Sequence, residues 1–261
     1  MPDTLVLDAA RQVVVRHWWV VRSGRPWATL VNGLFEPFLY LMSIGVGIGT
    51  LIGPKGQDLA GGYSYASFVA PALLATSAMN TACNETIYGI WFRLQTEKFF
   101  QSLVTTPMTP ADIGVGETAA ATVRGVVAGG CFLGVLAALG MVHSWWALLS
   151  LPAVALISFA FAAAGLSVST IMTEMHHTQY VQLVMLPMFL FSATFYPLSV
   201  YPDWLADVVR ALPLYQSTNL LRGLNLGEVG WPQIGATAYL LVLSGVTLWL
   251  ASRRLGRLLL H

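Results

Sequence analysis

The chain has 261 residues, of which 56% are hydrophobic and only 10% are charged, and its mean hydropathy is +0.67. An ordinary soluble domain carries about 25% charged residues, so this chain cannot cover a water-facing surface of normal polarity. A net charge of +1 excludes a polybasic nucleic-acid-binding protein. The two cysteines are too few for a disulfide framework, and no Cys/His cluster indicates a metal site. Composition therefore predicts a polytopic protein of the lipid bilayer.

Six stretches are long and apolar enough to cross that bilayer as helices, which takes about 20 residues each. They comprise roughly residues 26–53, 63–91, 113–142, 145–172, 181–197 and 233–251, and the fifth is the shortest. No linker, charge block or internal repeat divides the chain. We therefore predict one all-α transmembrane domain over residues 1–261, with a six-span core at 26–251 and a tail at 252–261.

Residues 1–25 do not read as a signal peptide, because charged residues interrupt any apolar core. These residues recur at helical spacing: Asp8, Arg11, Arg16 and Arg22. The pattern predicts an amphipathic helix in the membrane interface, with Trp18 at headgroup depth. The alternative is a disordered leader.

The distribution of lysine and arginine predicts the orientation. Six spans place both termini on one side, which would carry nine of these residues: Arg11, Arg16, Arg22, Arg25, Arg93, Lys98, Arg253, Arg254 and Arg257. The other side would carry three: Lys55, Arg210 and Arg222. Both termini, and the tail, are therefore expected in the cytoplasm.

The loop between the second and third spans contains an amphipathic pattern. Leu94, Phe100 and Leu103 share one helical face, while Glu97 and Lys98 lie outside it. Pro107 ends this helix, and Thr109 is expected to cap the next one, with Pro110 first and Asp112 third in that helix. The pattern fits either a surface connector or a helix that docks onto a cytoplasmic partner.

Two short helices are predicted between the fifth and sixth spans, at about 202–212 and 215–224, because Pro202 and Pro213 punctuate this segment. Both are too short to span and too apolar for free loops, so we expect them in the outer leaflet, anchored by Trp204. Asn219 and Arg222 would return toward the membrane, where they could meet a cargo. The first helix has a polar stripe, Asp203, Asp207 and Arg210, opposite an apolar one, Leu205, Val208, Val209 and Leu212.

Four charged residues lie within the predicted spans: Glu36, Glu85, Glu117 and Arg124. Such groups are costly in a membrane and usually face the bundle interior or a pathway. Glu36 and Arg124 are at similar depth, so we predict an ion pair between them. The alternative is a role of these charges in substrate binding.

Other signals predict little chemistry. Gly45, Gly47 and Gly49 follow no strand and precede no lysine, so close helix packing is the better interpretation than phosphate binding. His176 and His177 beside Glu174 have no evident further ligand and predict a solvated loop rather than a metal site. No nucleophile and base are arranged for catalysis. We expect no catalytic and no metal-binding residue.

Three stretches carry a resemblance to a known family. They read EPFLYLMSIGVGIG at 36–49, ETIYGIWFR at 85–93 leading to TTPMTPADIGVGE at 105–117, and FSATFYP at 191–197 followed by Pro213 and LRG at 221–223. In these motifs and in layout the chain resembles the ABC-2 family of ATP-binding-cassette export permeases, especially its NodJ-like lipo-oligosaccharide branch.

The resemblance implies a subunit that dimerises, with itself or with a paralogue, in a bacterial cytoplasmic membrane and binds a separate ATPase. ATP and magnesium would belong to that ATPase, and this chain would hold no cofactor. Residues 93–105 would form the coupling helix, with contacts from Arg93, Leu94, Glu97, Lys98, Phe100 and Leu103. The two outer helices would be a re-entrant pair that caps the pathway, with Pro202, Trp204, Pro213, Asn219 and Arg222.

The expected function is therefore that of the permease subunit of an ATP-driven exporter, not of an enzyme. The expected cargo is amphipathic, such as a lipid-linked oligosaccharide or lipo-oligosaccharide. A multidrug or antibiotic efflux permease is the alternative within the family. A secondary transporter is the alternative outside it, although the two related halves typical of that class are not evident.

Overall fold

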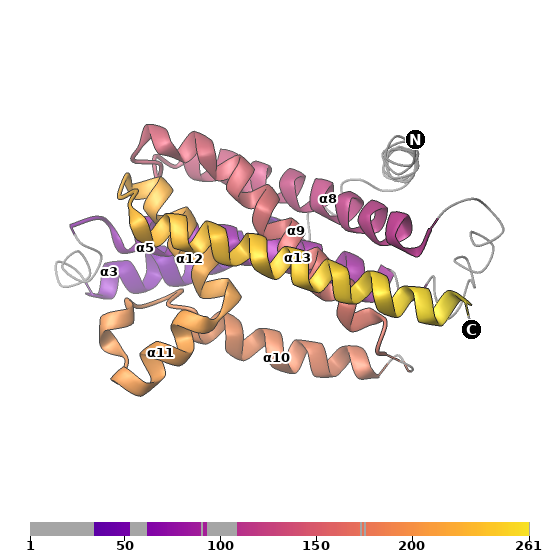
Figure 1. Cartoon of the computed structure of the whole chain (residues 1–261). Helices are drawn as coiled ribbons and strands as arrows, with labels where there is room; N and C mark the ends of the chain where they lie inside the picture. The colour runs from indigo at the N-terminus through magenta and orange to yellow at the C-terminus, as the bar shows by residue number, and fades with distance from the viewer. Residues whose placement is uncertain are drawn as a thin grey trace.

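A computed structural model describes residues 34–52, 62–89, 91, 92, 109–172, 174 and 176–260. All regular secondary structure among these residues is helical, and the helices form an elongated bundle (Figure 1). The predicted interfacial helix at 1–25 lies outside the described residues. So does the predicted coupling helix at 93–105, with all six of its contact residues.

Five helical segments are long and apolar enough to cross a membrane: Leu34–Leu51, Tyr65–Gly89, Ala111–Ala138, Trp145–Ser169 and Trp231–Arg257. The first contains η1 (Leu41–Ile48) and leads into α3 (Gly49–Ile52), and the second joins α5 (Tyr65–Asn84) to η2 (Glu85–Gly89). The third is α8 (Pro110–Ala138), the fourth joins η3 (Trp145–Leu149) to α9 (Ser150–Ser169), and the last is α13 (Trp231–Leu260). These segments coincide with five of the six predicted spans.

The predicted fifth span, 181–197, is wrong in its bounds. Helix α10 runs over His177–Phe191, and its 15 residues reach about 22 Å, which is less than the apolar core of a typical bilayer. The helix ends because the chain turns directly after it, with Ala193 in the left-handed region at a φ of 53°. Three short helices follow: η4 (Leu198–Val200), α11 (Asp203–Ala211) and α12 (Pro213–Leu226).

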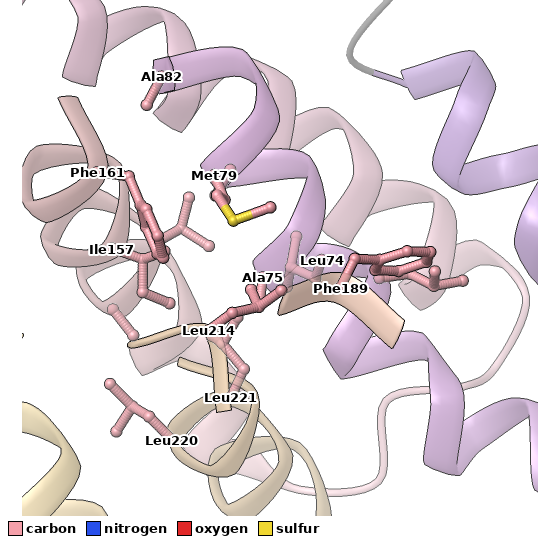
Figure 2. Close-up of a cluster of buried hydrophobic side chains, with 14 of the residues drawn as sticks. Leu74, Ala75, Met79, Ala82, Ile157, Phe161, Phe189, Leu214, Leu220 and Leu221 are labelled. Carbon is pink, nitrogen blue, oxygen red and sulfur yellow. The ribbon is translucent and has the colours of Figure 1, made fainter. Parts of the chain in front are cut away.

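Helix α5 lies in the centre of the bundle, where it contacts η1, α8, α9 and α12. Most of its residues carry small side chains, so its neighbours approach from several sides. Figure 2 shows Leu74, Ala75, Met79 and Ala82 of α5 among side chains from other helices. Those labelled are Ile157, Phe161, Phe189, Leu214, Leu220 and Leu221. The core is therefore continuous across α5, α9, α10 and α12.

Helix α8 begins with the capping box predicted from the sequence. The backbone N–H and the hydroxyl of Thr109 both donate to Asp112 Oδ2, at 2.8 and 2.7 Å, and the Asp112 N–H donates to Thr109 Oγ1 at 3.2 Å. Pro110 occupies the first turn, where its missing N–H has no cost. The cap fixes the point at which the chain enters the bundle after residue 108.

The predicted packing of small residues in the first helix is confirmed at two of three glycines. A Cβ on Gly45 would lie 3.5 Å from Ala66, and one on Gly49 would lie 3.5 Å from Tyr65, so both glycines face the start of α5. A Cβ on Gly47 would meet nothing within 4 Å. Close approach to α5 is thus the role of Gly45 and Gly49.

The two ends of the bundle are built differently. At one end, the Tyr63 hydroxyl donates to Leu226 O and the Asn225 amide donates to Met141 O, which joins the start of α5, the end of α12 and the turn after α8. Helix α11 lies at this end as well (Figure 1). At the other end, α8 begins beside the last turns of α13, near the carboxyl terminus (Figure 1). The short helices therefore cover one end only.

Candidate functional site

A largely buried ion pair joins Arg124 of α8 to Glu85 at the start of η2. Their side chains are only 16% and 18% exposed. The predicted pair of Glu36 with Arg124 is therefore wrong. The reason is tertiary: α8 packs directly against α5 and η2, whereas Glu36 lies beside α10. Arg124 Nε is buried without a hydrogen-bond partner among the described residues, so Arg124 depends on Glu85 for its compensation.

Glu117, the third predicted carboxylate, is only 3% exposed on α8, two turns before Arg124. It therefore lies inside the bundle. Asp112 is similarly buried, and it is held by the Thr109 cap. These acidic groups belong to the internal packing of α8 and do not line an open surface.

Glu36 has a different setting, in a recess of about 80 Å³ between the first helix, α5 and α10. Polar side chains from all three helices line it: Glu36, Tyr40, Thr76, Asn80 and Gln182. Among the described residues, no hydrogen bond or ion pair engages the Glu36 carboxylate or the Asn80 amide. The recess is thus a site with free polar groups at membrane depth.

Sequence reasoning found Glu36 but missed Asn80 and Gln182. A signal was present in α5 and η2, because Asn80, Asn84 and Tyr88 recur every four residues within an otherwise apolar segment. Asn84 and Tyr88 are exposed and Asn80 is half-buried, whereas most of α5 is buried. The face that α5 leaves open therefore carries a polar stripe. Gln182 Nε2 donates to the Tyr88 hydroxyl at 3.4 Å, which joins α10 to this stripe.

At the covered end, α11 and α12 match the two short helices predicted at 202–212 and 215–224. Pro202 directly precedes α11, and Pro213 begins α12. Gly227 then ends α12 with a φ of +82°, a conformation that glycine adopts without strain. Trp204 and half-buried Asn219 lie on these helices.

The apolar stripe predicted on α11 meets two different surroundings. Ala206 and Val209 form the buried side, whereas Val208 is 54% exposed and Trp204 is 71% exposed. The reason is that α11 turns its small residue, Ala206, inward and packs mainly against α12. Val208 and Trp204 are one turn apart on the uncovered side, so they form an exposed apolar face. Asp207 pairs with Arg210 at 2.8 Å in solvent.

Arg222 of α12 connects the covered end to α5. Its Nη2 donates to Ala193 O at 2.9 Å and its Nε to Phe68 O at 3.3 Å, and its Cζ lies 3.8 Å from the centre of the Phe68 ring. Burial lowers the pKa of the guanidinium to about 10, so it keeps its charge at neutral pH. The hydrogen bond to Ala193 holds the turn that ends α10.

The predicted solvated histidine segment lies at the start of α10. His176 Nδ1 is 3.0 Å from Glu174 Oε2, and both side chains are exposed. The His176 ring also contacts that of His177, with centroids 4.5 Å apart. In the described part of the chain, no three potential metal ligands converge.

Comparison with known proteins adds the decisive observation, because the ABC-2 type transporter family matches residues 10–226. The chain belongs to the ABC-2 type transporter family. It is 35% identical to nodulation protein J of Rhizobium leguminosarum bv. viciae over 204 residues, which cover 77% of this chain and 76% of the relative. The corresponding protein of R. leguminosarum bv. trifolii is 34% identical, with 77% and 75% coverage. That of Rhizobium meliloti (strain 1021) is 32% identical, with the same coverage.

This ABC-2 permease is therefore a NodJ-like, multi-pass membrane protein and a transport subunit of an ABC exporter. Its family works with an ABC ATPase that is a separate protein. Within this family, a recess with unpaired polar groups among spanning helices is a candidate for contact with the cargo.

Proposed function

We propose that this permease moves an amphipathic cargo with a hydroxyl-rich headgroup, such as a lipid-linked oligosaccharide or lipo-oligosaccharide, across a bacterial cytoplasmic membrane. The observation that carries the proposal is the polar stripe of Asn80, Asn84 and Tyr88 beside the Glu36 recess. Amide and carboxylate groups cannot face lipid tails without a large desolvation cost. The stripe therefore faces a polar pathway. A purely hydrophobic drug would leave these groups unsatisfied, which favours the oligosaccharide over the efflux alternative.

A second copy of the chain, or a paralogue, closes this pathway. A single chain exposes the stripe at its surface, so a partner that faces the stripe across a gap is needed to separate it from lipid. The carboxyl-terminal end of α13 carries Arg253, Arg254 and Arg257 and lies in the cytoplasm. The end covered by α11 and α12 then faces outward.

Energy enters through residues 93–105, which we propose as the coupling helix that docks onto the ATPase. ATP and magnesium bind to that ATPase. ATP binding there moves the coupling helix, and the dimer responds by rigid-body motion that opens or closes the pathway. The Thr109 cap supports this role, because it fixes the residue that precedes α8 to the first turn of that helix.

Co-purification with the ATPase tests this coupling. We expect the Phe100→Asp/Leu103→Asp variant to insert and dimerise but to lose the ATPase, because two charges would be desolvated in an apolar groove. A Gln101→Ala variant, altered outside the apolar face and outside the expected contact residues, should retain it. Normal co-purification of the double variant would refute the coupling assignment.

The transport function itself is tested in inverted vesicles that contain the permease and its ATPase. A fluorescent lipid-linked oligosaccharide should enter the vesicles only with hydrolysable ATP. Uptake that follows a proton gradient without the ATPase would instead identify a secondary transporter.

A further inference from the structure

We propose that the recess at Glu36, Asn80 and Gln182 is a binding site for the hydroxyl groups of a neutral sugar headgroup. The inference rests on the proposed export function and assigns the headgroup contact to named side chains. Three separate elements supply these residues: the first helix, α5 and α10.

The depth of the recess in the membrane makes contact between its polar groups and lipid tails unfavourable. Asn80 is 15 residues beyond the start of α5, or about 23 Å along the helix, which is well within the length of a membrane span. A free amide and a free carboxylate at this depth need polar partners. Among the described residues they have none, and a bound headgroup would supply them.

The chemistry of the lining favours hydroxyl groups. The amides of Asn80 and Gln182 can donate and accept, and the Glu36 carboxylate accepts. A sugar hydroxyl also donates and accepts, so it satisfies all three. The negative charge of Glu36 disfavours a phosphate or carboxylate headgroup.

The size and the aromatic wall of the recess fit the edge of a sugar ring. A volume of about 80 Å³ has room for the hydroxyl groups of a headgroup. Tyr40 and Phe189 lie beside it with ring centroids 5.6 Å apart. Their surfaces offer an apolar contact for the C–H face of the sugar.

A second copy of the chain fits the recess less well. In a two-fold symmetric interface, a residue near the axis meets its own counterpart. A copy seated with Glu36 near that axis would bring two carboxylates together in a low-dielectric place, where they repel each other. A neutral polyol carries no such penalty.

The experiment uses the full permease with its ATPase in nanodiscs and measures ATP hydrolysis. The probes are n-dodecyl-β-D-maltoside, dodecylphosphocholine and dodecyltrimethylammonium, which share one tail and differ in headgroup. We expect the maltoside to stimulate hydrolysis. In an Asn80→Leu/Gln182→Leu variant its half-maximal concentration should rise about tenfold, as the loss of two hydrogen bonds predicts.

Matched variants separate binding from folding. Asn80→Ser keeps a hydrogen-bonding group and should respond nearly as the unchanged protein does. Gln179→Leu removes an exposed amide from the same helix, one turn before Gln182 and outside the recess, and should have no effect. Gln179→Leu should also keep the basal ATP hydrolysis and the thermal stability of the unchanged protein.

Three results would overturn the inference. An unchanged maltoside response in the double variant would show that the recess does not bind the sugar. An equal loss of the dodecylphosphocholine response would show no selectivity for hydroxyl groups. A response to dodecyltrimethylammonium that Glu36→Gln abolishes would identify a cation site instead. In each case, ATP-dependent oligosaccharide uptake in the vesicle assay would leave the proposed function standing, whereas its absence would refute that function separately.

Discussion

Helices α5 and α13 are both long and apolar enough to span a membrane, but they have opposite surroundings. In the most apolar window of each span, 89% of the segment that contains α5 is buried inside the protein, against 22% for α13. The α5 segment is the least apolar of the five and α13 is among the more apolar. Of these two segments, the one that the protein buries more is therefore the less apolar.

The physical reason is that lipid tails are as apolar as leucine, so hydrophobicity does not drive helices together within a bilayer. Helices associate through close packing and hydrogen bonds, which small and polar residues permit. Helix α5 is rich in alanine, serine and threonine. Helix α13 instead exposes large side chains to the surroundings: Ile234, Leu241, Val242, Val246 and Trp249.

The largest effect should come from breaking the ion pair at the end of the α5 segment. Glu85→Gln or Arg124→Gln leaves the remaining charge unpaired within the bundle, and we expect a loss of about 3–5 kcal/mol of stability. The double change should be milder, because no charge remains unpaired. Thermal unfolding in detergent measures both. Additive losses would contradict the pairing.

The exposed pair of Asp207 with Arg210 is the control for that experiment. Asp207→Asn should change stability by less than about 1 kcal/mol, because solvent screens this pair.

Glycine substitutions should give the next largest effect and test the packing directly. A Cβ on Gly129 would lie 2.6 Å from Val154 Cγ1 and 3.6 Å from Leu74 Cδ1, at the junction of α8, α9 and α5. Gly129→Ala should therefore destabilise the protein by about 1–3 kcal/mol through overpacking. Gly245→Ala on α13 meets nothing within 4 Å and should be neutral or slightly stabilising. Equal melting temperatures of the two variants would refute the contrast between α5 and α13.

An effect of similar size is expected at Arg222, which joins α12 to α5. Arg222→Gln should cost about 1–3 kcal/mol, because two carbonyl groups lose a charged donor. On α13, Arg253 stacks on Trp249 with its Cζ 4.0 Å from the ring centre. Arg253→Gln should cost less than about 1 kcal/mol at this exposed site. Thermal unfolding compares the two, and a greater loss at Arg253 would contradict the anchoring role of Arg222.

The smallest effect concerns α11 and distinguishes burial by protein from burial by lipid. In a Cys83→Ser/Cys131→Ser background, Asp207→Cys should react fast with an impermeant thiol reagent added outside. Val209→Cys should be protected by the protein, whether in membranes or in detergent. Val208→Cys should be protected in membranes only, because its side chain is 54% exposed beside the described helices. Fast labelling of Val208→Cys in intact membranes would place α11 in solvent, and labelling only from the cytoplasm would reverse the topology.

Features that depend on neighbours in the chain were predictable from the sequence. The Thr109 cap needs only the Asp112 side chain three residues later, and proline fixes the starts of α11 and α12 through its own ring. Five spans were predictable because a span needs only length and apolar composition. The branch of the ABC-2 family followed from motifs in a fixed order.

Features that depend on which helices pack together were decided by the tertiary structure. The sequence places Glu36 and Arg124 at similar depth, but depth says nothing about rotation around the helix axis or about the neighbouring helix. Helix packing paired Arg124 with Glu85 and left Glu36 to meet Asn80 and Gln182 in the recess. The same cause turned Val208 outward, because the side of α11 that is buried depends on where α12 lies. A pattern along one helix defines its faces, and only the packing of helices determines what each face meets.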